Sequence, residues 1–204
     1  MLGHLQKISV LCILSISGCV NMTANINPVY KPLPGNTSPL QTIRPLNVVL
    51  QVEDQRPSYE QKRIGDRRGG FGKIIAGVNS TRSAPVILEE ALASEFTNNG
   101  HLILATQSTA ADRIVRVSVK KCWTENRVDL FNVTVMGSIV SDVTIIDPTT
   151  ATALVSRVIS GNSTDSHQLA LESSYEEALN KALVDFVRSF SRDPQILNAL
   201  RPSP

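Results

Sequence analysis

Alternation of apolar and polar residues predicts strands along the second part of the chain. From Leu46 to Val52 every second side chain is apolar, as in a strand with one buried face. The pattern recurs over 113–120, and a shorter apolar run lies at 101–105. These segments predict three separate strands, each too short to fold without neighbours.

The longest alternating stretch predicts a hairpin. Between 128 and 147 apolar residues recur at odd positions, from Phe131 to Ile145, and the pattern resumes over 153–159 after a turn that contains Pro148. Gly137 interrupts the first arm, and a glycine at this position permits a bulge or kink. The first arm is therefore one long strand, or two strands joined at Gly137.

Two segments carry apolar residues at helical spacing. The first begins after Ser83 and ends at Gly100, and the second lies within 168–192 and ends before Pro194. The stripe of the second consists of Leu171, Tyr175, Ala178, Leu179, Ala182, Phe186 and Phe190. A single stripe favours packing on a sheet. We therefore expect an α+β fold, with an antiparallel sheet of about four strands and two helices packed on one face.

The N-terminus carries a different kind of apolar run, from Ile8 to Ile16. Its nine residues would span about 14 Å as a helix, against about 30 Å for a bilayer core, so it is typical of a signal peptide. The run ends in Ile16, Ser17, Gly18 and Cys19. These four residues resemble the bacterial lipobox, although Leu is commoner than Ile at the first position. The resemblance implies transfer of a diacylglyceryl group to the Cys19 thiol, cleavage after Gly18 and acylation of the new amino group.

A lipidated Cys19 would attach the protein to a membrane. In the lipoproteins that this segment resembles, Asp after the cysteine commonly retains the protein in the inner membrane. Val20 in its place implies the outer membrane, facing the periplasm. An ordinary secretory signal cut near Gly18 is the alternative. In the lipidated case, residues 1–18 would be removed as the signal peptide. Residues 19–45 would form a lipidated N-terminus and Pro-rich tether, and 46–204 would be the globular domain.

Composition and residue spacing limit the kinds of binding and catalysis that the sequence supports. The 204 residues are 42% hydrophobic, enough for a core, and their net charge of +2 gives no argument for binding nucleic acid. Cys122 would be the one thiol left beside the lipidated cysteine, so we expect no intramolecular disulfide and an inert, partly buried thiol. His101 and His167 lack the spacing of metal ligands. We find no catalytic motif, and we expect no metal, no cofactor and no enzymatic activity.

The polar, glycine-rich stretch 54–80 is the candidate for binding a partner. It is predicted as a long surface loop, and Asp54 is expected to cap the turn at its start. The glycines at 69–72 have neither the phosphate-loop nor the dinucleotide-binding spacing. The stretch carries both basic and acidic side chains, so it is either a solvated loop or a surface that binds a partner. The residues assigned to that surface are Arg56, Arg63, Arg67, Arg68 and Lys73.

Several short motifs together resemble the YajG-type bacterial lipoproteins. They are the lipobox, Asp54-Gln55-Arg56-Pro57 after the first strand, Ile64-Gly65, and Ala111-Asp112-Arg113 before a later strand. The resemblance covers most of 46–200 and implies an α+β domain on the periplasmic face of the outer membrane, with no established activity.

Two functions from different classes fit this picture. The first is a binding or assembly accessory that holds an envelope protein through a sheet edge or through the stretch 54–80. The second is a carrier or sensor of an envelope lipid, glycan or peptidoglycan fragment. A concave apolar pocket would favour the second, and a filled core with an exposed apolar patch would favour the first. We expect the first, because so small a domain needs most of its apolar residues for its own core.

Overall fold

A computed structural model describes residues 23–32 and 37–201. The predicted lipobox, from Ile16 to Cys19, lies outside the described residues. The strands are β1 Ala24–Ile26, β2 Asn47–Asp54, β3 Arg63–Arg68, β4 Ile74–Ser80, β5 Leu102–Leu104, β6 Arg113–Val128, β7 Val133–Asp147 and β8 Thr152–His167. The helices are α1 Ala84–Asn98, α2 Glu172–Arg192 and α3 Pro194–Leu200, with short 3-10 turns η1 Pro39–Thr42, η2 Ser58–Glu60 and η3 Gly70–Gly72.

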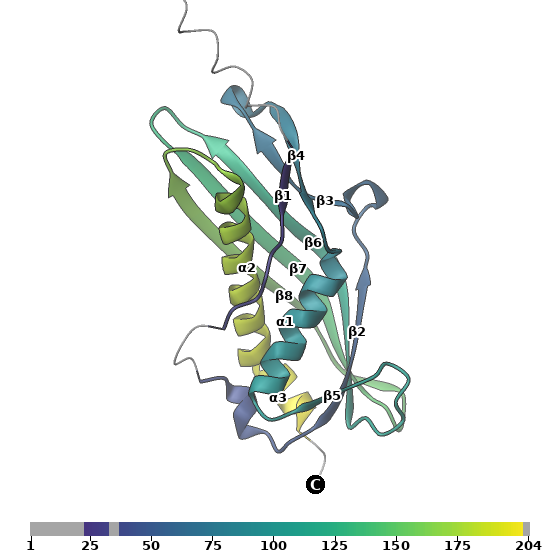
Figure 1. Cartoon of the computed structure of the whole chain (residues 1–204). Helices are drawn as coiled ribbons and strands as arrows, with labels where there is room; N and C mark the ends of the chain where they lie inside the picture. The colour runs from purple at the N-terminus through teal and green to yellow at the C-terminus, as the bar shows by residue number, and fades with distance from the viewer. Residues whose placement is uncertain (1–22, 33–36, 202–204) are drawn as a thin grey trace, which may run out of the picture.

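The strands form one mixed sheet centred on β6 (Figure 1). One edge of β6 pairs antiparallel with β7, which in turn pairs with β8. The other edge pairs parallel with β2 over its first half and with β3 further on. Beyond these, β5 pairs with β2, and β4 and then β1 extend from β3.

The predicted sheet is therefore wrong. The described residues contain eight strands and three α-helices, and four of the seven strand pairings are parallel. The prediction joined strands in chain order, which finds hairpins such as β7–β8. Parallel partners such as β2 and β6 are joined by long crossovers, and alternation within a strand says nothing about which distant strand it pairs with.

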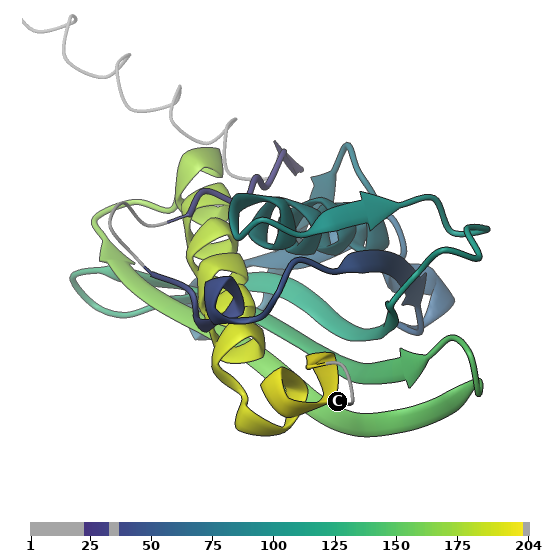
Figure 2. The same cartoon turned by 90° about the horizontal axis from the view of Figure 1, so that it is seen from below.

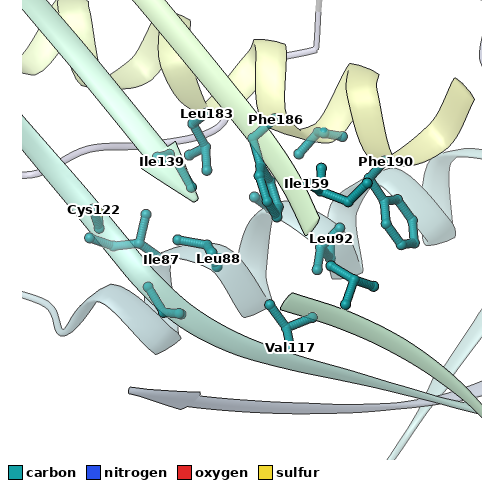
Figure 3. Close-up of a cluster of buried hydrophobic side chains, with 14 of the residues drawn as sticks. Ile87, Leu88, Leu92, Val117, Cys122, Ile139, Ile159, Leu183, Phe186 and Phe190 are labelled. Atoms are coloured by element: carbon teal, nitrogen blue, oxygen red, sulfur yellow. The ribbon is translucent and has the colours of Figure 1, made fainter. Parts of the chain in front are cut away.

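Helices α1 and α2 lie on the same side of the sheet, and the core fills the space between them and the strands (Figures 1 to 3). Phe96 of α1 and Phe190 of α2 meet edge to face, with ring centroids 5.7 Å apart. Both predicted helices are confirmed. Leu171 is the exception in the second stripe, because α2 begins at Glu172 and leaves Leu171 60% exposed.

Two glycines allow α2 to lie directly on the strands below it. A Cβ at Gly161 of β8 would be 2.2 Å from both the carbonyl oxygen of Ala182 and the backbone nitrogen of Phe186. A Cβ at Gly137 of β7 would be 2.5 Å from the carbonyl oxygen of Ala178. The pairing of β7 continues through Gly137 without a shift of register on either side. Of the two alternatives for this arm, one long strand is therefore confirmed and the bend at Gly137 is wrong; this glycine serves the close approach of the helix.

The described parts of the Pro-rich segment pack on the domain, unlike the extended tether that its composition predicts. Ala24 and Ile26 are buried, and β1 pairs with β4. Three alternate backbone N–H groups donate to side chains one helical turn apart on α2: Asn25 to Glu172 Oε1 (3.2 Å), Asn27 to Glu176 Oε2 (2.9 Å) and Val29 to Asn180 Oδ1 (2.8 Å). Two strand residues advance about as far as four helical residues, so the two spacings match. This segment is therefore fixed along α2.

The stretch predicted as a loop contains the hairpin of β3 and β4. These strands pair antiparallel, with irregular register near both ends. Ile64 and Val78 are its buried apolar side chains. With so few apolar positions the alternation is too weak to identify a strand, and the hairpin is held by pairing to β6 and β1 instead.

Candidate functional site

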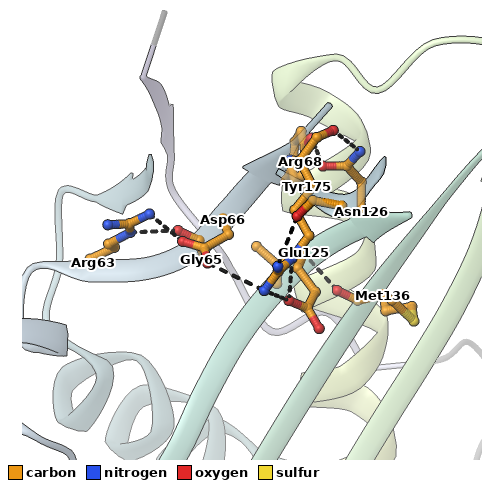
Figure 4. Close-up of polar contacts among 10 residues, drawn as sticks. Arg63, Gly65, Asp66, Arg68, Glu125, Asn126, Met136 and Tyr175 are labelled. Atoms are coloured by element: carbon orange, nitrogen blue, oxygen red, sulfur yellow. Dashed lines mark hydrogen bonds and ion pairs between the residues drawn. The ribbon is translucent and has the colours of Figure 1, made fainter. Parts of the chain in front are cut away.

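The β3–β4 hairpin brings its basic side chains against carboxylates of the same domain (Figure 4). Arg63 forms an ion pair with Asp66, which is only 5% exposed. Arg68 Nη2 lies 2.9 Å from Glu125 Oε2 of β6 and 3.5 Å from Asp66 Oδ2. Arg68 therefore holds the hairpin to β6, whereas the ion pair of Arg63 lies within β3 itself.

Asn126 of β6 joins the same hairpin to α2. Its Oδ1 accepts hydrogen bonds from the Arg68 backbone N–H (2.7 Å) and from the Tyr175 hydroxyl (2.8 Å), and its Nδ2 donates to the Arg68 carbonyl oxygen (2.8 Å). Burial raises the pKa of Tyr175, and Arg67 interacts with the same hydroxyl. This polar cluster, in which Asn126 bonds both Arg68 and Tyr175, stabilises the end of the sheet.

Arg56, also predicted to bind a partner, is buried. Its side chain bonds Asp54 through Nε (2.9 Å) and Nη2 (2.7 Å). Burial alone would raise the pKa of Asp54, but the hydrogen bonds from Arg56 outweigh it and lower this pKa below its ordinary value. Asp54 Oδ1 also accepts the Arg56 backbone N–H (3.1 Å), which confirms its predicted role in the turn. Arg56 thus fixes the connection between β2 and β3.

Cys122 faces the core below this ion pair. It is fully buried, and burial raises its pKa to about 12, so the thiol stays protonated at neutral pH. The predicted inert thiol agrees with this environment. Of the five residues proposed as a binding surface, Lys73 is the one with an exposed side chain. The structure therefore does not bring these five residues together on one accessible surface.

The edge of β8 is the most extended feature open to a partner. This strand has 16 residues, and β7 is its one strand partner within the described part of the chain. The Asn162 backbone N–H donates to Asp185 Oδ2 of α2 (3.0 Å), away from β7. Because antiparallel pairing alternates, Val158 directs its N–H to the same free edge. Val158 is 67% exposed and Leu154 is 44% exposed.

Such an edge is unusual, because exposed edge strands are normally short or guarded by charge or proline. The sequence predicted a strand at 153–159, but the hairpin pattern does not reveal whether another strand lies beyond it. A sheet edge is one of the two binding surfaces expected from the sequence, but the sequence does not identify β8 as the strand that forms it. The exposed apolar residues at even positions of β8 are the one sequence signal that indicates it.

Two open grooves border β8. The first lies between β8 and α2, and the second lies where β8 meets α3. The lining surface of the first groove, which includes Glu177, Lys181 and Asp185, is mostly apolar, and that of the second, which includes Arg113, Asn198 and Arg201, is mostly polar. Between sheet and helices the described side chains form a continuous apolar core. This arrangement favours binding at the surface.

The described residues contain neither a cluster of metal ligands nor a membrane-spanning helix. Nowhere in 23–32 and 37–201 do three or more His, Cys, Asp or Glu side chains gather as a metal ion would require. Within the same ranges, no helix has both the length and the hydropathy needed to cross a bilayer.

The fold defines a class of small α+β domains with a mixed sheet and helices on one side. The solved structure of XCC0632 from Xanthomonas campestris shares it, with a TM-score of 0.59 at 12% identity over 87% of this chain and 96% of that one. The chain belongs to the family described as uncharacterized lipoprotein, whose model matches residues 36–201. The resemblance to YajG-type lipoproteins is confirmed at this level.

Two further solved structures are similar over more limited parts. Lipoprotein GNA1162 from Neisseria meningitidis matches at 8% identity, over 59% of this chain and 85% of that one, with a TM-score of 0.36. A minor lipoprotein from Acinetobacter baumannii matches at 13% identity, over 79% of this chain and 99% of that one, with a TM-score of 0.40. No curated protein sequence matches the chain.

Proposed function

We propose that this chain is a lipid-anchored, non-enzymatic lipoprotein on the periplasmic face of the outer membrane, and that it binds a segment of an envelope protein along the free edge of β8. Membership of a lipoprotein family supports the anchor. Cys19 is the residue that would carry the lipid, with Ile16, Ser17 and Gly18 forming the signal-peptidase motif. Val20 after the cysteine supports the outer membrane.

The observation that carries the binding role is the free edge of β8. A strand of 16 residues extends over roughly 50 Å, well beyond the usual strand of five or six residues. Because the outward N–H of Asn162 already bonds Asp185 of α2, the free part of this edge lies on the side of Val158. An added strand would bond its backbone to this edge, and alternate side chains such as Val158 would contact the partner's side chains. The edge therefore offers both the backbone groups and the apolar contacts that strand addition uses.

Cross-linking from the edge tests this role. A photoreactive residue at exposed Ser156 should form an adduct with an envelope protein in living cells. Val158→Pro removes one outward N–H while leaving the pairing with β7 intact, so the adduct should be lost. Val158→Thr keeps the N–H and a branched side chain, and the adduct should persist. Equal adduct yields in the two variants, with matching thermal melts, would reject strand addition at β8.

A further inference from the structure

We propose that a second membrane contact accompanies the lipid anchor: the apolar tips of three connections at one end of the sheet insert into the surface of a phospholipid bilayer. The apolar tips are Phe71, Leu130, Phe131, Leu169 and Leu171. The inference rests on the proposed lipidation of Cys19, and it concerns a surface different from the edge of β8.

Each of these side chains is held out in solvent. Leu130 is 94% exposed, Phe131 is 93% exposed, and Phe71 is fully exposed. Phe71 also has a φ of +60°, a left-handed conformation that is unfavourable for a bulky residue. An exposed aromatic ring in such a conformation stabilises nothing inside the domain. We therefore expect the Phe71 side chain to contact an apolar surface outside this domain when the protein functions.

The three connections lie at the same end of the molecule (Figure 1). The Arg68 backbone N–H bonds Asn126, so the turn containing Phe71 lies beside the end of β6. The β6–β7 turn carries Leu130 and Phe131 and follows directly. Val133 pairs with His167, which places the connection from β8 to α2, with Leu169 and Leu171, beside that turn. Residues far apart in sequence thus form one apolar end.

The chain's own course places the membrane at this end. Ala24 pairs with Val78, and β1 runs parallel to β4, whose first residue, Ile74, follows the turn of Phe71. The residues before Ala24 are therefore connected to the domain from the side of the tips. Cys19 is five residues before Ala24, a span of at most about 18 Å.

The reach of the anchor is short because β1 is fixed. Its pairing with β4 and its hydrogen bonds to Glu172 and Glu176 hold it on the domain. Ile74 lies four residues beyond Val78 toward the tips, about 13 Å along the strand. A lipid on Cys19 would therefore hold the tips within reach of the bilayer surface.

The chemistry of the tips suits a phospholipid surface. Phenylalanine and leucine enter the acyl region, and a nearby cation such as exposed Lys73 contacts the headgroup phosphates. The short connection to Cys19 favours a bilayer over a protein partner here.

Fluorescence quenching in vesicles tests the contact on the full, anchored protein. Trp123 is the one tryptophan of the chain, so Trp123→Phe gives a dark background. Phe131→Trp then places a probe on the tips, and Leu102→Trp places one on an exposed residue paired with Asn47 at the opposite end of the sheet. The vesicles contain phosphatidylethanolamine and phosphatidylglycerol with brominated acyl chains.

We expect the probe at 131 to show blue-shifted emission and strong quenching by bromine, and the probe at 102 to show neither. A protein that sediments with the vesicles but leaves both probes unquenched would overturn this inference and leave the anchor standing. A blue shift at 131 without quenching would mean that a second copy covers the tips, and would also overturn it. A chain that does not sediment with the vesicles would overturn both this inference and the proposed lipid anchor.

Discussion

The contact of α2 with β8 at Gly161 gives the sharpest test of the fold. Gly161→Ala would place a Cβ 2.2 Å from backbone atoms of Ala182 and Phe186, where ordinary contacts are about 3.4 Å or longer. The obstacle is helix backbone, so no side chain can rotate away, and α2 must move by about 1 Å. This movement would loosen the packing of Phe186 and Phe190.

We expect Gly161→Ala to lower the free energy of unfolding by about 3 kcal/mol, the upper range for overpacking. That is a large part of the roughly 5–15 kcal/mol that stabilises a domain. The assay is urea unfolding of the purified chain followed by circular dichroism. Gly70→Ala is the matched control, because nothing lies within 4 Å of its added Cβ, and its effect should stay within about 0.5 kcal/mol. Equal stability of the two variants would refute direct contact between α2 and β8.

Three other substitutions test the interior. Phe186→Ala should cost about 3–5 kcal/mol in the same urea assay, because this side chain is fully buried, and a negligible loss would contradict that placement. Arg56→Ala should cost about 3–5 kcal/mol, because Asp54 would keep its charge without its partner, and an unchanged unfolding midpoint would count against the ion pair. His101 accepts the Leu46 N–H at Nδ1, and burial lowers the pKa of its imidazole. Its contribution to the free energy of unfolding is therefore complete above the unfolded pKa of about 6.5, and it is lost as pH falls through the folded pKa. His101→Gln should therefore reduce the fall in thermal melting temperature between pH 7.5 and pH 5.5. An unaltered dependence on pH would contradict this assignment.

Local patterns predicted the helices and the β7–β8 hairpin, because their signals lie within single segments. The stripe of α2 follows from spacing alone, since its buried positions repeat along one face. The parallel pairing of β2 with β6 could not be predicted in this way, because the two strands are separated in the chain by β3, β4, α1 and β5. Strand β1 was missed because prolines around it outweighed the alternation of Ala24 and Ile26.

The candidate site was less predictable than the fold. Arg56 and Arg68 look like a basic surface in the sequence, since nothing there shows that Asp54 and Glu125 neutralise them. A sequence shows how many charged side chains a segment has, but it does not show which of them form ion pairs in the fold. The exposed edge of β8 and the apolar tips depend on which strand is last and which turns share one end, and both are properties of the assembled sheet.

Attachment of this protein to the membrane is proposed to depend on one sulfur atom, that of Cys19. Cells grown with an alkyne fatty acid should label the wild-type chain, and the label should appear in the outer-membrane fraction. Cys19→Ala should abolish the label, because no other group accepts the diacylglyceryl chain, whereas Cys12→Ala within the signal sequence should retain it. Label kept at full strength in Cys19→Ala would contradict the account.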